Sequence, residues 1–182
     1  MGIPRRLPAV LLLFALAACA APQTARVIES PGDLPRRAMV ETVPFFPQQV
    51  YYCGPAALAM TLTWSGLAET PESLAPQVYT PGREGTLAPD IVAAARRKGR
   101  LAVEVRALDG LLAEIAAGNP VLVFQNLALD WWPQWHFAVA IGYDLDRRML
   151  VLHSGTTERL ETPLDAFERT WARSGHWALL TL

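Results

Sequence analysis

The chain is 182 residues long, 52% apolar and 18% charged, and its formal net charge is −1. This length and apolar content allow a single domain with a substantial core. The near-zero charge and the lack of a basic stripe exclude an ordinary nucleic-acid-binding protein, because phosphate binding needs clustered lysine and arginine. The one dense cluster, residues 96–98, ends a predicted helix, where cations offset the helix dipole. No cysteines and histidines have metal-ligand spacing, so the sequence predicts neither a metal nor a cofactor.

Residues 1–18 have the pattern of a secretory signal peptide. Two arginines precede a short apolar stretch that cannot span a bilayer as a mature helix. Leu-Ala-Ala before Cys19 resembles the lipobox of bacterial lipoproteins, which implies cleavage before Cys19 and lipidation of that residue. Ala20 in place of aspartate then implies the outer membrane, on the periplasmic side of the bacterial envelope. Two alternatives stay open: a signal peptide cut nearby without a lipid, and a disulfide between Cys19 and Cys53.

The rest of the chain divides into a tether and a domain. Residues 19–38 contain prolines, Gly32 and scattered charges without a period, so we expect a tether there and a domain over residues 39–182. Helical patterns cover residues 56–63, 70–79, 87–98, 109–117 and 163–173, and strand patterns cover 101–105, 121–124, 137–143, 149–152 and 176–182. Helices followed by antiparallel strands predict an α+β fold, with the N-terminal helices packed on an antiparallel sheet.

Cys53 lies where the first helix of this domain is expected to begin. Pro55 suits a first helical turn, in which no backbone N–H is needed. Unpaired N–H groups and the positive end of the helix dipole favour a thiolate there, which is the nucleophilic form. Gln48 or Gln49, just upstream, can donate an N–H to an oxyanion. The competing interpretation is a buried free cysteine that packs as a small apolar side chain.

His136 is the best placed of the chain's three histidines to act as a base. It begins an alternating strand whose return, after a turn near Asp146, is expected to bring residue 155 or 156 opposite it. His153 and His176 are less favoured. A lone histidine in an apolar strand is more often a satisfied core residue than a base. The assignment of His136 as a base therefore depends on its combination with Cys53.

Three tryptophans directly precede this histidine, namely Trp131, Trp132 and Trp135. Aromatic side chains give an extended substrate large, rigid contact area. The tryptophans therefore either wall a cleft or pack as core over the sheet edge, and the sequence leaves both possibilities open.

The segments PQQVYYCGPAALAM and WHFAVAIGYD together resemble the bacteriocin-processing (double-glycine leader) cysteine peptidases of the papain-like clan. They are most similar to the stand-alone bacterial lipoproteins of that group. The resemblance covers residues 43–182 and implies a papain-like cysteine peptidase fold. It also implies that Cys53 is the nucleophile, that His136 is the base, and that Gln48 rather than Gln49 holds the oxyanion.

The chain departs from the family at the residue that orients the base. Where the family has Asp-Pro, this sequence has Ser154 and Gly155. A serine can accept one hydrogen bond but carries no charge, so it stabilises an imidazolium less well than a carboxylate does. Three possibilities follow: Ser154 orients His136 weakly, Gln125 or Asn126 orients it instead, or the domain no longer cleaves peptides.

The sequence therefore predicts a membrane-anchored, periplasmic cysteine peptidase that acts on a peptide or protein substrate by Cys–His catalysis. One alternative is an NlpC-type hydrolase of cell-wall peptides. Another is a catalytically inactive peptide-binding lipoprotein, which Ser154 favours. The paired-glycine specificity of the leader peptidases is not carried over, because those peptidases are fused to transporters.

Overall fold

The structure is a computed structural model, and it describes residues 21–48 and 51–182. The predicted signal peptide, Cys19 and Gln49 lie outside these residues, so what was said of them stays a prediction. Among the described residues, no helix is both long and apolar enough to cross a membrane.

Six α-helices and nine strands make up the described chain. The helices are α2 (Pro22–Glu29), α3 (Cys53–Trp64), α4 (Pro71–Val78), α5 (Ala88–Arg97), α6 (Leu108–Ala116) and α7 (Leu164–Ala172), with a 3₁₀ turn over Pro81–Arg83. The strands are β1 (Arg37–Met39), β2 (Tyr79–Thr80), β3 (Gly85–Thr86), β4 (Ala102–Val105), β5 (Val121–Asn126), β6 (Trp135–Asp144), β7 (Met149–Ser154), β8 (Thr157–Pro163) and β9 (Ala178–Thr181).

Strand β6 is the central element of the large antiparallel sheet. The strand order is β4-β9-β5-β6-β7-β8, and β1 pairs with the far end of β6. β5 pairs with β6 from Trp135 to Ala140, whereas the ladder with β7 begins only at Val139, opposite His153. At His136 and Phe137, therefore, β7 leaves the second edge of β6 unpaired. This opening is where the candidate site forms.

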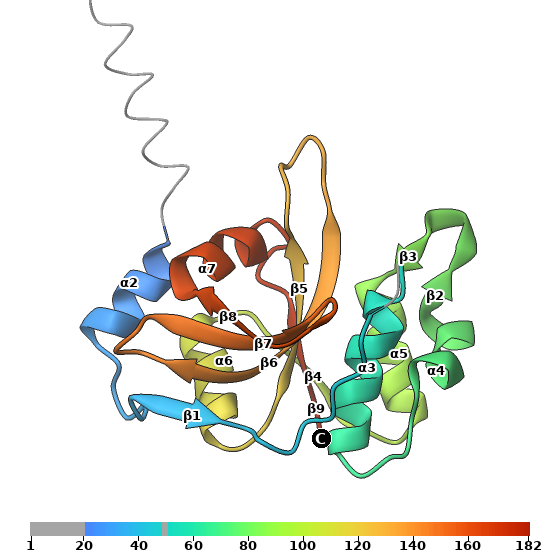
Figure 1. The fold of residues 1–182 in the computed structure, drawn as a ribbon, viewed down its shortest axis with the longest axis horizontal. Helices are drawn as coiled ribbons and strands as arrows, with labels where there is room; N and C mark the ends of the chain where they lie inside the picture. The colour runs from blue at the N-terminus through green and yellow to red at the C-terminus, as the bar shows by residue number, and fades with distance from the viewer. Residues whose placement is uncertain (1–20, 49–50) are drawn as a thin grey trace, which may run out of the picture.

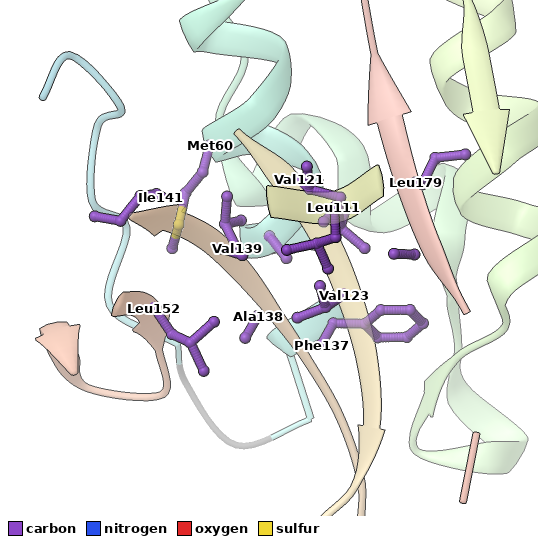
Figure 2. Packing of buried hydrophobic residues seen from close by; sticks show 14 of the residues in the cluster. Met60, Leu111, Val121, Val123, Phe137, Ala138, Val139, Ile141, Leu152 and Leu179 are labelled. Carbon is purple, nitrogen blue, oxygen red and sulfur yellow. The ribbon is translucent and has the colours of Figure 1, made fainter. Parts of the chain in front are cut away.

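Helix α3 supplies much of the core beside β6. It is apolar on all sides, and residues 54–62 are all buried, as expected for a helix enclosed by other elements. Figure 2 shows Met60 of α3 beside Ile141 of β6, and Leu111 of α6 close to Val121 of β5. Packing along the whole of α3 fixes its direction, and with it the place of its first residue.

The helices gather at two sides of the sheet. Figure 1 shows α3, α4 and α5 together with the small β2–β3 sheet at the right, and α2 and α7 near β7 and β8 at the left. The arrangement confirms the predicted α+β fold, in which the N-terminal helices α3 to α5 pack beside an antiparallel sheet.

The tether predicted over residues 19–38 is wrong for the part that the structure describes. Pro22–Glu29 forms α2, and Arg37–Met39 forms β1. The buried Glu168 of α7 accepts hydrogen bonds from the N–H groups of Gln23 and Thr24 at 2.9 and 2.6 Å. Glu168 therefore caps the start of α2, a place where a negative charge also suits the helix dipole.

The same helix is also tied to α6. The Gln23 side-chain oxygen accepts a hydrogen bond from the Leu108 N–H at 2.7 Å, at the first residue of α6. Only Thr24 and Val27 of α2 are buried, too few positions for a visible period. The partners that stabilise α2 come from distant parts of the chain, which explains why residues 22–29 resemble a linker in sequence.

Strand β8 was also missed. Its residues, Thr157–Pro163, are exposed except for one, so the stretch lacks the apolar alternation that predicts a half-buried strand. β8 is an edge strand whose charged side chains face solvent, a common protection of sheet edges. Pairing with β7, rather than an apolar pattern of its own, makes it a strand.

We expect Glu168→Ala to lower the free energy of unfolding by about 3 kcal/mol, because it leaves two part-buried N–H groups without their charged acceptor. Urea denaturation measures the change. Asp165→Ala on the same helix is the control: among the described residues its carboxylate pairs only with the exposed Arg148, so the expected loss is about 1 kcal/mol or less. Equal losses in the two variants would contradict the capping role of Glu168.

Candidate active site

Cys53 is the first residue of α3 and is partly buried. Burial has the largest effect on its thiol and raises its pKa above the ordinary value, although backbone N–H groups of Phe137, Gly54 and Cys53 itself act to lower it. The helix thus begins where the sequence predicted. The expected preference for a thiolate is contradicted, because loss of hydration disfavours the charged form more than the N–H groups favour it.

His136 is the second residue of β6, and its ring meets the end of the neighbouring strand. Its Nε2 atom lies 2.9 Å from the hydroxyl oxygen of Ser154, the last residue of β7. No other hydrogen bond to this ring occurs in the described part of the chain. Nδ1 is therefore the nitrogen left for a reacting group.

Burial lowers the pKa of His136 from 6.5 to about 4. The ring is consequently neutral at physiological pH, the form in which an imidazole can accept a proton. The unfolded chain binds more protons than the folded one between these two pKa values. The contribution of His136 to stability is therefore present above pH 6.5 and is lost as the pH falls towards 4.

Gln48 is held by hydrogen bonds at both ends of its side-chain amide. Its oxygen accepts from the Gly155 N–H at 3.1 Å, and its nitrogen donates to the Phe137 carbonyl at 3.1 Å. The Gln48 N–H also donates to the Gly155 carbonyl at 2.9 Å. Gly155 has φ +60°, a left-handed conformation that glycine adopts without strain. The side chain is buried, so these contacts fix its amide in place.

The main chain of Phe137 joins these groups. Its N–H acts on the Cys53 sulfur and its carbonyl accepts from Gln48, on the edge of β6 that β7 leaves open. The structure thus brings Cys53, Gln48, His136 and Ser154 together around two consecutive residues of β6. It places no hydrogen bond between the Cys53 sulfur and the His136 ring within the described residues. Sequence reasoning missed Phe137 and Gly155, because backbone groups give no residue-type signal.

The alternative partners for His136 are engaged elsewhere. Gln125 donates to the Thr170 hydroxyl at 2.6 Å. The Asn126 side chain accepts from the Ala128 and Gln134 N–H groups and so shapes the β5–β6 loop. Asp144, the last residue of β6, accepts from the Arg147 N–H in the β6–β7 turn. Of the residues considered from sequence, only Ser154 reaches the His136 ring.

Within the described residues, neither of the other histidines hydrogen-bonds to Cys53. His153 is buried, with its Nε2 3.2 Å from the Val43 carbonyl and its Nδ1 accepting from the Arg159 N–H at 3.2 Å. His176 packs edge-on against Trp171. Both histidines therefore have structural roles, which agrees with the weaker sequence support for them as bases.

The tryptophans before His136 do not pack as core. Trp131 and Trp132 are 79% and 73% exposed, and Trp135 is 49% exposed with one ring face stacked on Phe124. Trp131 and Trp132 lie on the loop between β5 and β6, which projects from the body of the protein in Figure 1, and Trp135 is the first residue of β6. Of the two interpretations left open, packing over the sheet edge is wrong for Trp131 and Trp132.

The described residues contain no cluster of histidine, cysteine, aspartate or glutamate that could hold a metal ion. A shallow hollow of about 490 Å³ lies between α5 and β4, lined in part by Arg96, Glu104 and Arg106. None of the four candidate residues lines it. The chemistry of Cys53 is therefore not connected with this hollow.

Ser154→Asp is expected to raise the pKa of His136 from about 4, because a carboxylate at the Ser154 position favours the imidazolium. An NMR titration of the ring nitrogens measures the shift. Thr157→Asp, an exposed position across the same turn, is the control, where solvent screens the added charge. An unchanged His136 pKa in Ser154→Asp would show that the two side chains do not interact in solution.

Solved structures share this architecture. A protein described as a C39-like peptidase from Bacillus anthracis superimposes with a TM-score of 0.67 at 19% identity, covering 81% of this chain and 98% of that one. The peptidase domain of Streptococcus ComA, a bifunctional ABC transporter of a quorum-sensing pathway, gives 0.60 at 21% identity, with coverages of 76% and 97%.

A double glycine motif protease from an AMS/PCAT transporter, solved with its leader peptide, gives a TM-score of 0.60 at 21% identity, covering 79% of this chain and 93% of that one. These likenesses confirm the papain-like peptidase fold expected from the sequence. No curated protein matches the chain. Residues 40–179 match the Peptidase_C39 like family. Since the match spans most of the chain, the protein belongs to the C39-like peptidase family.

Proposed function

We propose that the protein is a cysteine peptidase in which Cys53 attacks a peptide carbonyl and His136 is the general base. The observation that carries the proposal is the convergence of Cys53 and Gln48 on the main chain of Phe137, the residue after His136, whose ring is neutral. The family and the fold support peptide hydrolysis.

The cycle begins with a neutral thiol and a neutral imidazole. As the Cys53 sulfur bonds to the carbonyl carbon, His136 takes the thiol proton, and charge develops on the carbonyl oxygen. The Cys53 N–H at the start of α3 and the second N–H of the Gln48 amide donate to that oxygen. The first Gln48 N–H is committed to Phe137, which holds the amide in position.

His136 then returns the proton to the leaving amine as the peptide C–N bond breaks. Water, deprotonated by the same ring, hydrolyses the thioester and releases the acid product. While the ring is protonated, Ser154 accepts its Nε2 hydrogen bond. A serine stabilises this imidazolium less than a carboxylate does, so a modest rate is expected.

The substrate is a peptide or an unfolded segment of a protein. The related transporter protease was solved with its leader peptide, which supports an extended peptide as the ligand of this fold. The exposed Trp131 and Trp132 of the β5–β6 loop and Trp135 at the start of β6 come shortly before His136 in the chain and offer rigid apolar area to such a substrate. The cleavage specificity of transporter-linked relatives is not assigned to this chain.

A second candidate function is peptide binding without cleavage. It is favoured by the raised pKa of Cys53 and by the lack of a described hydrogen bond between Cys53 and His136. The two candidates differ in whether a bound peptide is hydrolysed, so a cleavage assay separates them.

The purified protein is expected to cleave members of an internally quenched peptide library, whereas Cys53→Ala abolishes cleavage. His136→Ala lowers kcat/KM by about 10²- to 10⁴-fold, and Gln48→Ala lowers kcat by about 10²-fold. Thr157→Ala is an exposed control with unchanged rates. Binding without cleavage in the wild type would establish the second candidate, and release of peptides from purified sacculi would indicate a cell-wall hydrolase.

The proposed location is the periplasmic side of the bacterial envelope, with a lipid anchor at Cys19. Its support is the sequence of residues 1–19. Cells grown with an alkyne-labelled fatty acid are expected to incorporate label into the wild type and not into Cys19→Ser. Label that persists in Cys19→Ser, or its absence from both proteins, would contradict an anchor at this residue. Cys53→Ser is the matched control that retains the label.

A further inference from the structure

The β2–β3 hairpin, residues 79–86, lies against the turn that leads into Cys53. Its two short strands pair Tyr79 with Thr86 and Thr80 with Gly85. In Figure 1 the hairpin sits beside the upper end of α3, the end where Cys53 lies. The contacts come from both of its strands and from its turn.

The first contacts involve two tyrosines upstream of the nucleophile. The Tyr52 ring, at the residue before α3, stacks on Tyr79 of β2 with centroids 5.3 Å apart and an interplanar angle of 29°. Tyr51 adopts φ +68°, an unusual conformation for a residue with a side chain. The charge of Glu84, in the hairpin turn, raises the pKa of the Tyr51 hydroxyl. The backbone entering α3 is therefore held from one side by the hairpin.

The third contact is the closest. Gly54, directly after Cys53, is buried, and a Cβ atom built on it would lie closer than 3.0 Å to the Cβ, Oγ1 and Cγ2 atoms of Thr86. Gly54 has no left-handed φ, so its backbone conformation does not require glycine. Glycine also weakens a helix relative to alanine. The reason for a glycine here is space: it lets β3 touch the main chain of the first turn of α3.

From these contacts we infer that the β2–β3 hairpin positions the nucleophile, with Thr86 on Gly54 fixing the direction of the Cys53 side chain towards Phe137 and His136. Thr86 and Tyr79 are positioning residues in this arrangement, because they act through the backbone of residues 52–54. The Thr86 hydroxyl is buried and has no hydrogen-bond partner among the described residues. Thr86 therefore acts through the shape of its side chain, which a valine can reproduce.

The inference rests on the proposed role of Cys53, but its test does not depend on turnover. The primary readout is the rate and pH profile of Cys53 alkylation by iodoacetamide, with the adduct located by peptide mapping so that Cys19 does not interfere. Where the wild type cleaves peptides, kcat and KM are measured as well. Thermal unfolding of each variant separates misplacement from loss of the fold.

Gly54→Ala is expected to change the pH profile of alkylation and to lower kcat by about 10²-fold, with little change in KM, since a displacement of about 1 Å costs that much. In the Gly54→Ala background, shortening the Thr86 side chain should restore the alkylation profile and kcat stepwise. Gly54→Ala with Thr86→Ala keeps the clash with the Thr86 Cβ and recovers partly, and Gly54→Ala with Thr86→Gly recovers almost fully. Thr86→Val alone and Gly85→Ala, whose added Cβ meets only ordinary contacts, leave both readouts at wild-type values.

Tyr79→Ala and Tyr79→Phe provide a second pair that introduces no clash, for the case in which Gly54→Ala does not fold. Tyr79→Ala removes the stacking on Tyr52 and shifts the alkylation profile. Tyr79→Phe keeps both the stacking and the wild-type profile. Unchanged alkylation in both Gly54→Ala and Tyr79→Ala would overturn the inference, as would the lack of any recovery with Thr86→Gly. A wild type that cleaves nothing, but whose alkylation follows the expected series, would refute the proposed peptidase activity and leave the positioning role intact.

Discussion

The main chain of Phe137 is the point on which the site depends. An antiparallel strand turns its N–H and C=O groups in pairs towards one neighbour or the other. At Phe137 this pair points to the edge of β6 where pairing with β7 has not yet begun. Buried backbone groups need partners. Here the Phe137 carbonyl accepts from the amide of Gln48, and the Phe137 N–H acts to lower the pKa of the Cys53 thiol, so this open edge of β6 is also the centre of the site.

Burial sets the electrostatics of the site. Both Cys53 and His136 are pushed towards their uncharged forms, Cys53 by a raised pKa and His136 by a lowered one. A neutral serine beside His136 is consistent with such an environment, because a carboxylate there would itself have to be buried and would draw a proton onto the ring. The same reasoning explains why the helix start does not by itself give a thiolate. The N–H groups act in the expected direction, but the loss of hydration is larger.

The sequence predicted the elements whose packing faces are apolar. α3, β5, β6 and β7 read clearly because their buried positions follow one another in the chain, as in residues 54–62. α2 and β8 were missed because their own residues show too little apolar periodicity, and the contacts with Glu168 and with β7 that stabilise them are not visible in the sequence. For the site, the motifs around Cys53 and His136 were sufficient to name candidate residues. They did not separate Ser154 from Gln125 and Asn126, because each could reach a ring in some arrangement of strands.

By itself, the sequence determined the kinds of chemical groups available: one thiol at a helix start, an amide shortly before it, and a histidine at a strand start. Local patterns carry this information, since capping, alternation and turn residues act over a few positions. Only the tertiary structure decided that Ser154 meets His136, that burial raises the pKa of Cys53, and that the β2–β3 hairpin touches Gly54. These are questions of burial and of contact between residues distant in the chain. Their answers depend on the register of the whole sheet and on the packing of α3, which no short segment specifies.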